Sequence, residues 1–499
     1  MDLLSLIPAV LPQAILVVVG VVCLLLYLLL QPPKEPRHIP AVPFWVSLLP
    51  LIKDVDQQVI YNTYIRDLLL EHGAIKIFFG SQWNVLVQRS TFLSQVFKHE
   101  DLYQKSGNQK KIPGSVLASF LGDNIISSHG GVWKLYQDIM KPGLQEGWSL
   151  SPIYESASML LEHFKQTPSP LPVQEPLQRY TIANLVRVLM HLNIDMNHKE
   201  TIQLSQMQSK VKAQIFRPLF MSFPFLDTWG LRSREAARRD AAQFTDHLVC
   251  MLAGAWFEKS DEHHQDDSQH NNIGHRLVSA WEEGRISHQQ LRDNVTVLFV
   301  AGQENPQLAI LSTLYLIAKN PTVQERLHSE IMNTTGNRPN EEQLRNMPYL
   351  TACVYESLRL LPPIGQLINR LATTPLVLGE DTVVPQGMYL GYNSYATNRD
   401  PSVWGPDAEE FLPDRWGETA SDVQKSYRRR RAQAEFITFH GGRRACLGER
   451  FALLQLKVTL STLVRHLRWE LDPSWPDRMT PAGPLAPRGL RLKFEQRYT

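Results

Sequence analysis

The chain has 499 residues, of which 43% are hydrophobic and 20% are charged, and its formal net charge is +2. This balance excludes a disordered, fibrous or collagen-like protein. The small net charge gives no general attraction to nucleic acid, and the sequence contains no zinc finger or other nucleic-acid-binding module. We therefore expect no nucleic-acid partner, while the length alone allows several domains.

The N-terminal segment predicts a membrane anchor at residues 1–33. Residues 3–33 contain no charged side chain, and residues 14–30 read AILVVVGVVCLLLYLLL. About 20 apolar residues in a helix cross a hydrocarbon core of roughly 30 Å. A cleavable signal peptide is the alternative, but its basic n-region and its small-residue cleavage site are missing. Lys34 and Arg37 follow the apolar run, so the positive-inside rule places the body of the protein in the cytosol.

A proline-rich stretch follows the anchor. Residues 31–44 read QPPKEPRHIPAVPF, and prolines cannot continue a helix. They favour stiff, extended backbone. We predict a hinge at residues 34–44 and one large domain over residues 45–499.

The body of the chain predicts a mainly α fold with small β-sheets. Apolar residues recur at helical spacing in residues 131–144, 154–166, 179–193, 234–260 and 291–320. Short strand-like runs occur at residues 74–80, 84–88, 375–385 and 388–393. We expect these strands to form two hairpin-like regions.

Two polar stretches leave alternatives open. Residues 259–275 contain several His and Asp residues that suggest a metal site, but without an apolar frame a solvated loop is the favoured interpretation. Residues 425–431, KSYRRRR, are interpreted as a solvated basic loop. The alternative is a docking patch for an acidic partner.

The four cysteines are Cys23, Cys250, Cys353 and Cys446, and no two of them form a CxxC pair. This spacing argues against a disulfide scaffold and a structural zinc site. Cys446 lies in FHGGRRACLG, residues 439–448, directly before an apolar helix-like run. Arginine charge, backbone N–H groups and a helix N-terminus favour a thiolate. That thiolate suits a nucleophile assisted by a histidine such as His440, or the axial ligand of haem iron.

The run Phe439-x-x-Gly442-x-Arg444-x-Cys446-x-Gly448 resembles the haem-binding loop of the cytochrome P450 monooxygenases. The resemblance implies that Cys446 is the metal ligand of the haem iron. It further implies that Arg444 pairs with a haem propionate and that Phe439 packs beside the sulfur.

A second motif is YESLRL, in which Glu356 and Arg359 lie at i and i+3 on one helix face. It resembles the ExxR motif of the same family. With Arg415 of FLPDRW, the resemblance implies a buried charge triad with a structural role. Arg370, in GQLINR, matches the position of a further propionate ligand.

Within the predicted helix over residues 291–320, Pro306 has no N–H for the carbonyl of Gly302. We expect a kink there, and a kink that serves packing alone is the alternative. AGQEN, residues 301–305, resembles the oxygen-activation motif A-G-x-D/E-T. Gly302, Glu304 and Asn305 are therefore the candidate catalytic residues, with Asn305 in place of the usual threonine. An amide still donates a hydrogen bond.

The segment SHGGVWKLYQ matches a further part of the haem site. Trp133 corresponds to the tryptophan that touches a propionate, although a core position is the alternative. Gln137 stands where the family usually has arginine, so its amide would hold a carboxylate without charge. Lys134 or His129 would then compensate.

The resemblance implies a helical fold with haem between the kinked helix and the thiolate loop. NADPH acts only indirectly, through NADPH–cytochrome P450 reductase, with cytochrome b5 as a further electron donor. The expected location is the endoplasmic reticulum membrane, with a single-pass anchor and a cytosolic catalytic domain.

The expected substrate is a small aromatic or lipophilic secondary metabolite. Asn305 and the segment ISSHGGVW also resemble the fungal dityrosine-forming subfamily, which favours oxidative coupling of tyrosine-derived phenols. Plain hydroxylation of a lipophilic metabolite is the alternative. A haem-thiolate sensor without turnover, and a peroxide-using or isomerising enzyme, are two further alternatives. By family position, residues 105–128 and 364–368 are expected to face the substrate.

Overall fold

The computed structural model describes residues 31–145, 148–261, 272–334 and 336–497, and residues 16, 17, 19–21, 24, 27 and 30 before them. The predicted anchor and most of the polar stretch 259–275 therefore lie outside the described residues. Over the part of the chain that is described, no helix has the length and apolar character needed to cross a membrane.

Helices make up most of the described chain, which confirms the predicted mainly α fold. The α-helices are α2 (Leu49–Ile52), α3 (Gln57–Ile60), α4 (Arg66–His72), α5 (Ser90–Lys98), α6 (Asn108–Lys111), α7 (Val116–Leu121), α8 (Gly130–Gln145), α9 (Ser151–Gln166), α10 (Gln174–Leu189), α11 (Lys199–Ile215), α12 (Pro218–Ser222), α13 (Arg232–Asp261), α14 (Ile273–Glu282), α15 (His288–Lys319), α16 (Pro321–Met332), α17 (Glu341–Arg345), α18 (Pro348–Leu360), α19 (Ser394–Thr397), α20 (Pro401–Trp404), α21 (Ala420–Ala432) and α22 (Glu449–His466).

The strands form three small sheets. They are β1 (Ala74–Phe79), β2 (Gln82–Val87), β3 (Tyr103–Lys105), β4 (Leu171–Pro172), β5 (Gln366–Ala372), β6 (Leu376–Leu378), β7 (Thr382–Val384), β8 (Tyr389–Asn393), β9 (Leu467–Leu471) and β10 (Arg491–Gln496). The five-stranded sheet has the order β1-β2-β8-β5-β3, the three-stranded sheet β4-β10-β9, and β6 pairs with β7.

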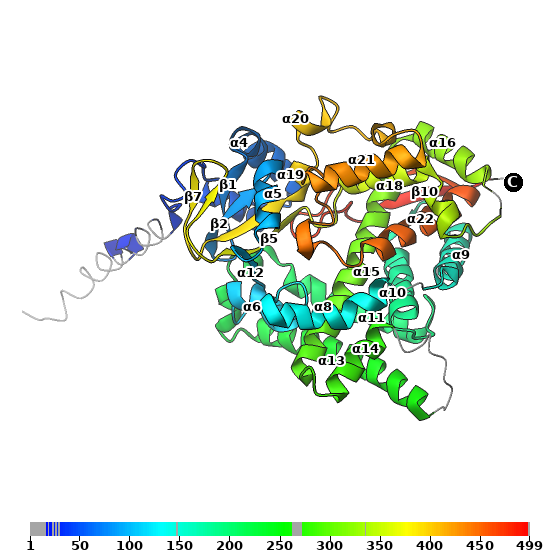
Figure 1. The fold of residues 1–499 in the computed structure, drawn as a ribbon, viewed down its shortest axis with the longest axis horizontal. Helices are drawn as coiled ribbons and strands as arrows, with labels where there is room; N and C mark the ends of the chain where they lie inside the picture. The colour runs from blue at the N-terminus through cyan, green and yellow to red at the C-terminus, as the bar shows by residue number, and fades with distance from the viewer. Residues whose placement is uncertain are drawn as a thin grey trace, which may run out of the picture.

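The central helix α15 runs through the body of the molecule, and the five-stranded sheet lies to one side of it (Figure 1). Residues 306–318 of α15 are all buried. A helix that is apolar on every side packs in the interior of a protein. Helices α10, α18 and α22 contact α15, so this helix forms the axis of the main hydrophobic core.

Two expectations about the body are wrong. Residues 388–393 do not belong to a separate hairpin, because β8 pairs in parallel with β2 and antiparallel with β5. The stretch 425–431 is not a loop but the C-terminal half of α21, where Val423 and Tyr427 are buried. An apolar pair at i and i+4 gives one helix face a core contact, and arginine is a good helix former.

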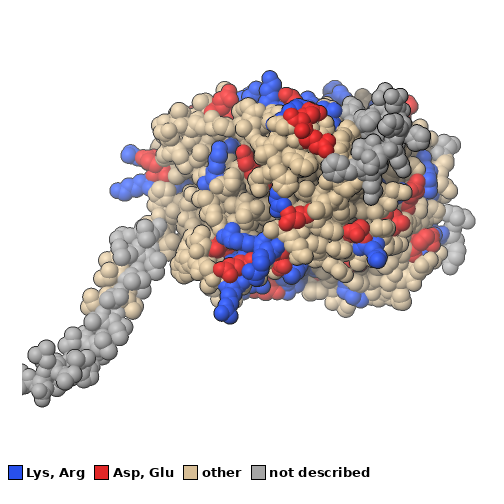
Figure 2. All heavy atoms as spheres, turned by 90° about the horizontal axis from the view of Figure 1, so that it is seen from below, with Lys and Arg blue, Asp and Glu red and all other residues tan. Residues whose placement is uncertain are grey.

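The surface carries charge of both signs. In the view of Figure 2, basic and acidic side chains lie close together in several groups, between larger areas of other residues. This mixture agrees with the small net charge of the chain.

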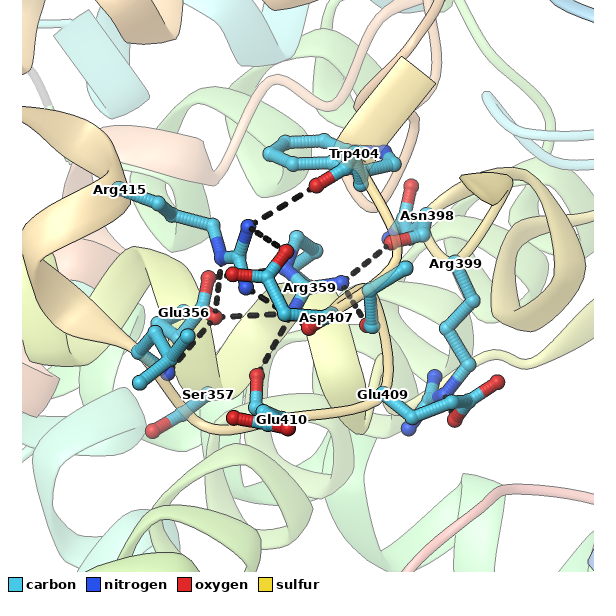
Figure 3. A network of polar contacts seen from close by, with 12 residues as sticks. Glu356, Ser357, Arg359, Asn398, Arg399, Trp404, Asp407, Glu409, Glu410 and Arg415 are labelled. Atoms are coloured by element: carbon cyan, nitrogen blue, oxygen red, sulfur yellow. Dashed lines mark hydrogen bonds and ion pairs between the residues drawn. The ribbon is translucent and has the colours of Figure 1, made fainter. Parts of the chain in front are cut away.

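A buried polar network connects α18 to the segment that leads toward Cys446 (Figure 3). The Glu356 carboxylate accepts two hydrogen bonds of 2.8 Å from Arg359 and one of 2.8 Å from Arg415. Trp416 donates a further bond of 2.9 Å to it. Glu356 and Arg359 have no exposed side-chain surface. The structure thus brings the three residues of the expected charge triad together.

Removal of the Glu356 charge should destabilise the fold. In Glu356→Gln two guanidinium groups lose their carboxylate, and breaking a buried ion pair costs roughly 3–5 kcal/mol. Thermal or denaturant unfolding would measure this loss. The control is Glu282→Gln, an exposed carboxylate at the end of α14, and equal effects of the two substitutions would contradict the prediction.

Candidate functional site

The loop that carries Cys446 packs closely on α5. Gly442 has a φ of +65°, and a side chain there would meet the carbonyl oxygen of Phe97. A side chain at Gly441 would meet the Phe97 ring. The backbone N–H of Cys446 donates to the carbonyl of Phe439 at 2.9 Å. The two glycines therefore allow a closed loop to lie directly against α5.

Among the cysteines that the structure describes, Cys446 alone lines the large internal cavity. Cys353 is buried in α18, and Cys250 is exposed on α13. Burial raises the pKa of the Cys446 thiol to about 11, against the opposing effect of the backbone N–H groups of Gly448 and Glu449. The N–H groups of Gly448 and Glu449, at the start of α22, are groups of the kind expected to favour a thiolate. Binding of a metal ion would favour the deprotonated thiol.

His440 is not suited to act as a general base for Cys446. Burial, reinforced by Lys105 and Arg370, lowers the pKa of His440 to about 3. Its ring packs edge-on against Tyr392, with the ring centroids 5.1 Å apart. These observations argue against the nucleophile alternative.

The cavity has a volume of about 700 Å³. One part of its wall is the Cys446 loop, and another is the segment 297–306 of α15. Residues 364–368 and many of residues 105–127 also line it. The segments expected to face a substrate thus surround the same space as the expected metal ligand.

The three candidate catalytic residues on α15, Gly302, Glu304 and Asn305, all line the cavity. Pro306 lies inside the helix, so the carbonyl of Gly302 has no backbone N–H four residues later. A side chain at Gly302 would approach Leu185 of α10 to 2.7 Å. Gly302 therefore serves helix packing as well as the cavity wall.

Glu304 forms an ion pair that sequence analysis did not predict. Its carboxylate lies 2.6 Å from the ammonium group of Lys212 on α11. The side chain of Glu304 is 5% exposed and that of Lys212 is 27% exposed. The next residue toward the N-terminus, Gln303, accepts a hydrogen bond of 2.6 Å from Gln208, also on α11.

A group of basic residues lies near the Cys446 loop. The Glu100 carboxylate accepts bonds of 2.8 Å from Arg444 and 3.0 Å from Arg370. Lys105 of β3 stands directly opposite Arg370 of β5 in the sheet register and is 4% exposed. Burial, together with these two arginines, lowers the pKa of Lys105 well below its usual value. Lys105 and Arg444 line the cavity, whereas Arg370 lies behind them, outside the lining residues.

Trp133 and Gln137 of α8 both line the cavity. The Arg444 guanidinium lies 4.5 Å from the centre of the Trp133 ring. Lys134 is exposed, and neither Lys134 nor His129 belongs to the cavity lining.

Sequence analysis missed Glu100, Lys105 and Lys212. The sequence gives a weak indication that Lys105 is buried, because the alternation of side chains along β3 places it on the same face as the buried Tyr103. Glu100 and Lys212 are single charges without a motif, and their partners are hundreds or tens of residues away in sequence. Only the folded chain brings these pairs together.

Comparisons with known proteins agree with this geometry. The family model described as Cytochrome P450 matches residues 36–494. Cytochrome P450-DIT2 of Saccharomyces cerevisiae is 38% identical over 490 residues, which cover 95% of this chain and 98% of that protein. Cytochrome P450 monooxygenase xanG of Aspergillus fumigatus is 38% identical over 478 residues, 93% of this chain and 87% of the relative. Cytochrome P450 72A13 of Arabidopsis thaliana is 24% identical over 436 residues, 85% of this chain and 81% of that protein.

The first two relatives are fungal, which confirms the resemblance to a fungal subfamily. The family model and both relatives cover most of the chain. The chain therefore belongs to the cytochrome P450 family and is a haem-dependent monooxygenase whose iron carries a cysteine thiolate ligand.

Proposed function

We propose that this enzyme oxidises a small aromatic or lipophilic secondary metabolite, by oxidative coupling of a tyrosine-derived phenol. The observation that carries the proposal is the single cavity that Cys446, the AGQEN segment and the expected substrate segments line together. The fungal relatives support a role in fungal-type metabolism. Plain hydroxylation of a lipophilic metabolite is the second candidate, since most of the lining is apolar.

The residues around the cavity fit haem. Arg370 and Arg444 share one carboxylate, Glu100, and Lys105 is a third basic group beside them whose charged form burial disfavours. A bound anion would favour the protonated form of Lys105, and the two propionates of haem would supply negative charge to these three basic groups. Cys446 would hold the iron, while Lys105 and Arg444 would hold the propionates.

Haem bound at Cys446 supplies the activation of dioxygen that oxidises the substrate. The protein positions and protects this chemistry. Glu304 places a carboxylate on the cavity wall, and its ion pair with Lys212 of α11 holds it in position. Asn305 donates a hydrogen bond into the cavity in place of the usual hydroxyl. The apolar lining excludes water from the substrate.

Electrons come from NADPH through NADPH–cytochrome P450 reductase, with cytochrome b5 as a further donor. Residues 1–33 anchor the enzyme in the endoplasmic reticulum membrane, and the catalytic domain faces the cytosol. The charge-free run of residues 3–33 supports this anchor.

One experiment separates the two candidate reactions. The enzyme, its reductase and NADPH are incubated with tyrosine-derived phenols and with neutral lipophilic compounds, and the products are analysed by mass spectrometry. Phenol dimers without added oxygen support coupling, whereas products with one added oxygen atom support hydroxylation. A complete absence of turnover would favour the haem-thiolate sensor.

Cys446→Ser should abolish the spectrum of thiolate-ligated haem. The reduced wild type with carbon monoxide should show the absorption band of that ligation, because Cys446 alone among the described cysteines lines the cavity. Cys250→Ser is the matched control and should leave the band unchanged. A band that survives Cys446→Ser would exclude Cys446 as the ligand.

Asn305→Ala should lower the product formed per NADPH oxidised by about tenfold or more, since a lost hydrogen-bond donor at a reacting centre costs about 10²–10³ in rate. Asn305→Thr should retain part of this coupling because its hydroxyl also donates. Parallel measurements of NADPH oxidation and product test both. If both variants form as much product per NADPH oxidised as the wild type, Asn305 has no role in the reaction.

Lys105→Met should accelerate haem loss roughly tenfold, as expected when a charge-assisted hydrogen bond is removed. Transfer of haem to an apoglobin measures the rate. Lys105→Arg should retain haem, and Lys134→Met, at an exposed position of α8, is the control. With haem whose propionates are esterified, the wild type and Lys105→Met should lose haem at the same rate. Faster loss from the variant would contradict the pairing of Lys105 with a propionate.

A further inference from the structure

The cavity wall carries an excess of positive charge. Among the described residues that line it, the basic ones are Lys105, Lys111, Arg443 and Arg444, and the only acidic one is Glu304. Glu304 is already neutralised by Lys212, which lies outside the lining. The molecules that fill this cavity should therefore bring negative charge with them.

The haem propionates account for only part of this excess. In the proposed function they neutralise the cluster of Lys105, Arg370 and Arg444. Arg443 is exposed, so solvent screens its charge. One cation, Lys111, then has no counter-charge.

Lys111 is the last residue of α6, in the segment expected to face the substrate. Its ammonium group donates a hydrogen bond of 2.6 Å to the carbonyl of Ile368, which belongs to the other expected substrate segment. The same group lies 5.6 Å from the centre of the Phe79 ring. Phe79 and Ile368 line the cavity too.

No carboxylate of the described chain forms an ion pair with Lys111. Burial lowers the pKa of Lys111 to about 8, so the group is still mainly protonated at pH 7. A cation in such a site is costly unless it is paired. Its backbone bond uses one of three donors, and the others remain for a ligand.

We propose that Lys111 binds a carboxylate of the substrate, and hence that the substrate is a small carboxylic acid with an apolar or aromatic body. This inference rests on the proposed function and deepens it. A single lysine suits a monoanionic carboxylate, whereas a phosphate monoester, with nearly two charges and three acceptor oxygens, calls for a cluster of cations. Apolar lining residues such as Leu117 and Met221 would contact the rest of the molecule.

Matched pairs of probes test the proposal. The purified holoenzyme is titrated at pH 7 with 3-(4-hydroxyphenyl)propanoate and its amide, and with decanoate and decanamide, and binding is followed by the haem difference spectrum. The wild type should bind each acid about tenfold more tightly than its amide. Lys111→Met should remove this preference, and Lys111→Arg should keep it.

The control variant is Lys110→Met, since Lys110 is exposed on the same helix and does not line the cavity. It should keep the preference for acids. Equal binding of acid and amide by the wild type, a preference that persists in Lys111→Met, or no binding of any probe would each overturn the proposal.

Two further results separate the substrate-binding role of Lys111 from the proposed aromatic substrate and from a role in binding a haem propionate. If only the aliphatic pair binds, and its acid preference depends on Lys111, the lysine site stands while the aromatic substrate of the proposed function fails. If Lys111→Met accelerates haem loss as Lys105→Met does, Lys111 serves a propionate instead, and the substrate site is overturned.

Discussion

The active-site loop depends on the buried pairing of Glu356 with Arg359. Arg359 also donates hydrogen bonds to the backbone carbonyls of Asn398, Ala408 and Glu410, at 2.8, 2.6 and 3.0 Å. One side chain on α18 therefore fixes three points of a distant segment. Because no surface of this ion pair is exposed to water, loss of either charge leaves its partner buried and unpaired.

The same network reaches the cysteine loop through Asn398. The side chain of Asn398 donates to Thr438 at 2.8 Å and accepts from the backbone N–H of Ile437 at 3.1 Å. Thr438 in turn donates to the carbonyl of Leu358 on α18 at 2.8 Å. Residues 437 and 438 lead directly into Phe439 and the loop. The ion pair thus positions Cys446 without contact with the substrate.

The sequence predicted the motifs well because each one is local. The loop around Cys446, the i and i+3 pair on α18, and the AGQEN segment all lie within a few residues, and their chemistry follows from residue type and spacing. The long helices were equally clear, since apolar periodicity over many residues is a strong signal. Their observed bounds differ from the predicted ones by a few residues at the ends.

The remaining features depend on contacts between distant parts of the chain. The strand β5 was missed because QLINRLA has no turn signal, and its place between β3 and β8 depends on pairing with distant strands. The arginine-rich part of α21 looked like a loop because its apolar positions are few. The effect of burial on the pKa of Cys446 was not predicted, since sequence shows nearby charges but not the loss of water around the sulfur.

The AGQEN segment is held from the outside by α11. Gln208 and Lys212 lie one turn apart on α11 and contact Gln303 and Glu304, which are neighbours on α15. Gln303 also donates to Thr181 of α10 and to Gln307, so three helices share one buried amide network. A buried, satisfied network fixes a single helix register. Glu304 and Asn305 follow Gln303 directly. Any shift of α11 along α15 would therefore move the side chains of these two residues in the cavity. The unusual Asn305 is therefore part of a site whose geometry is set by residues that no motif contains.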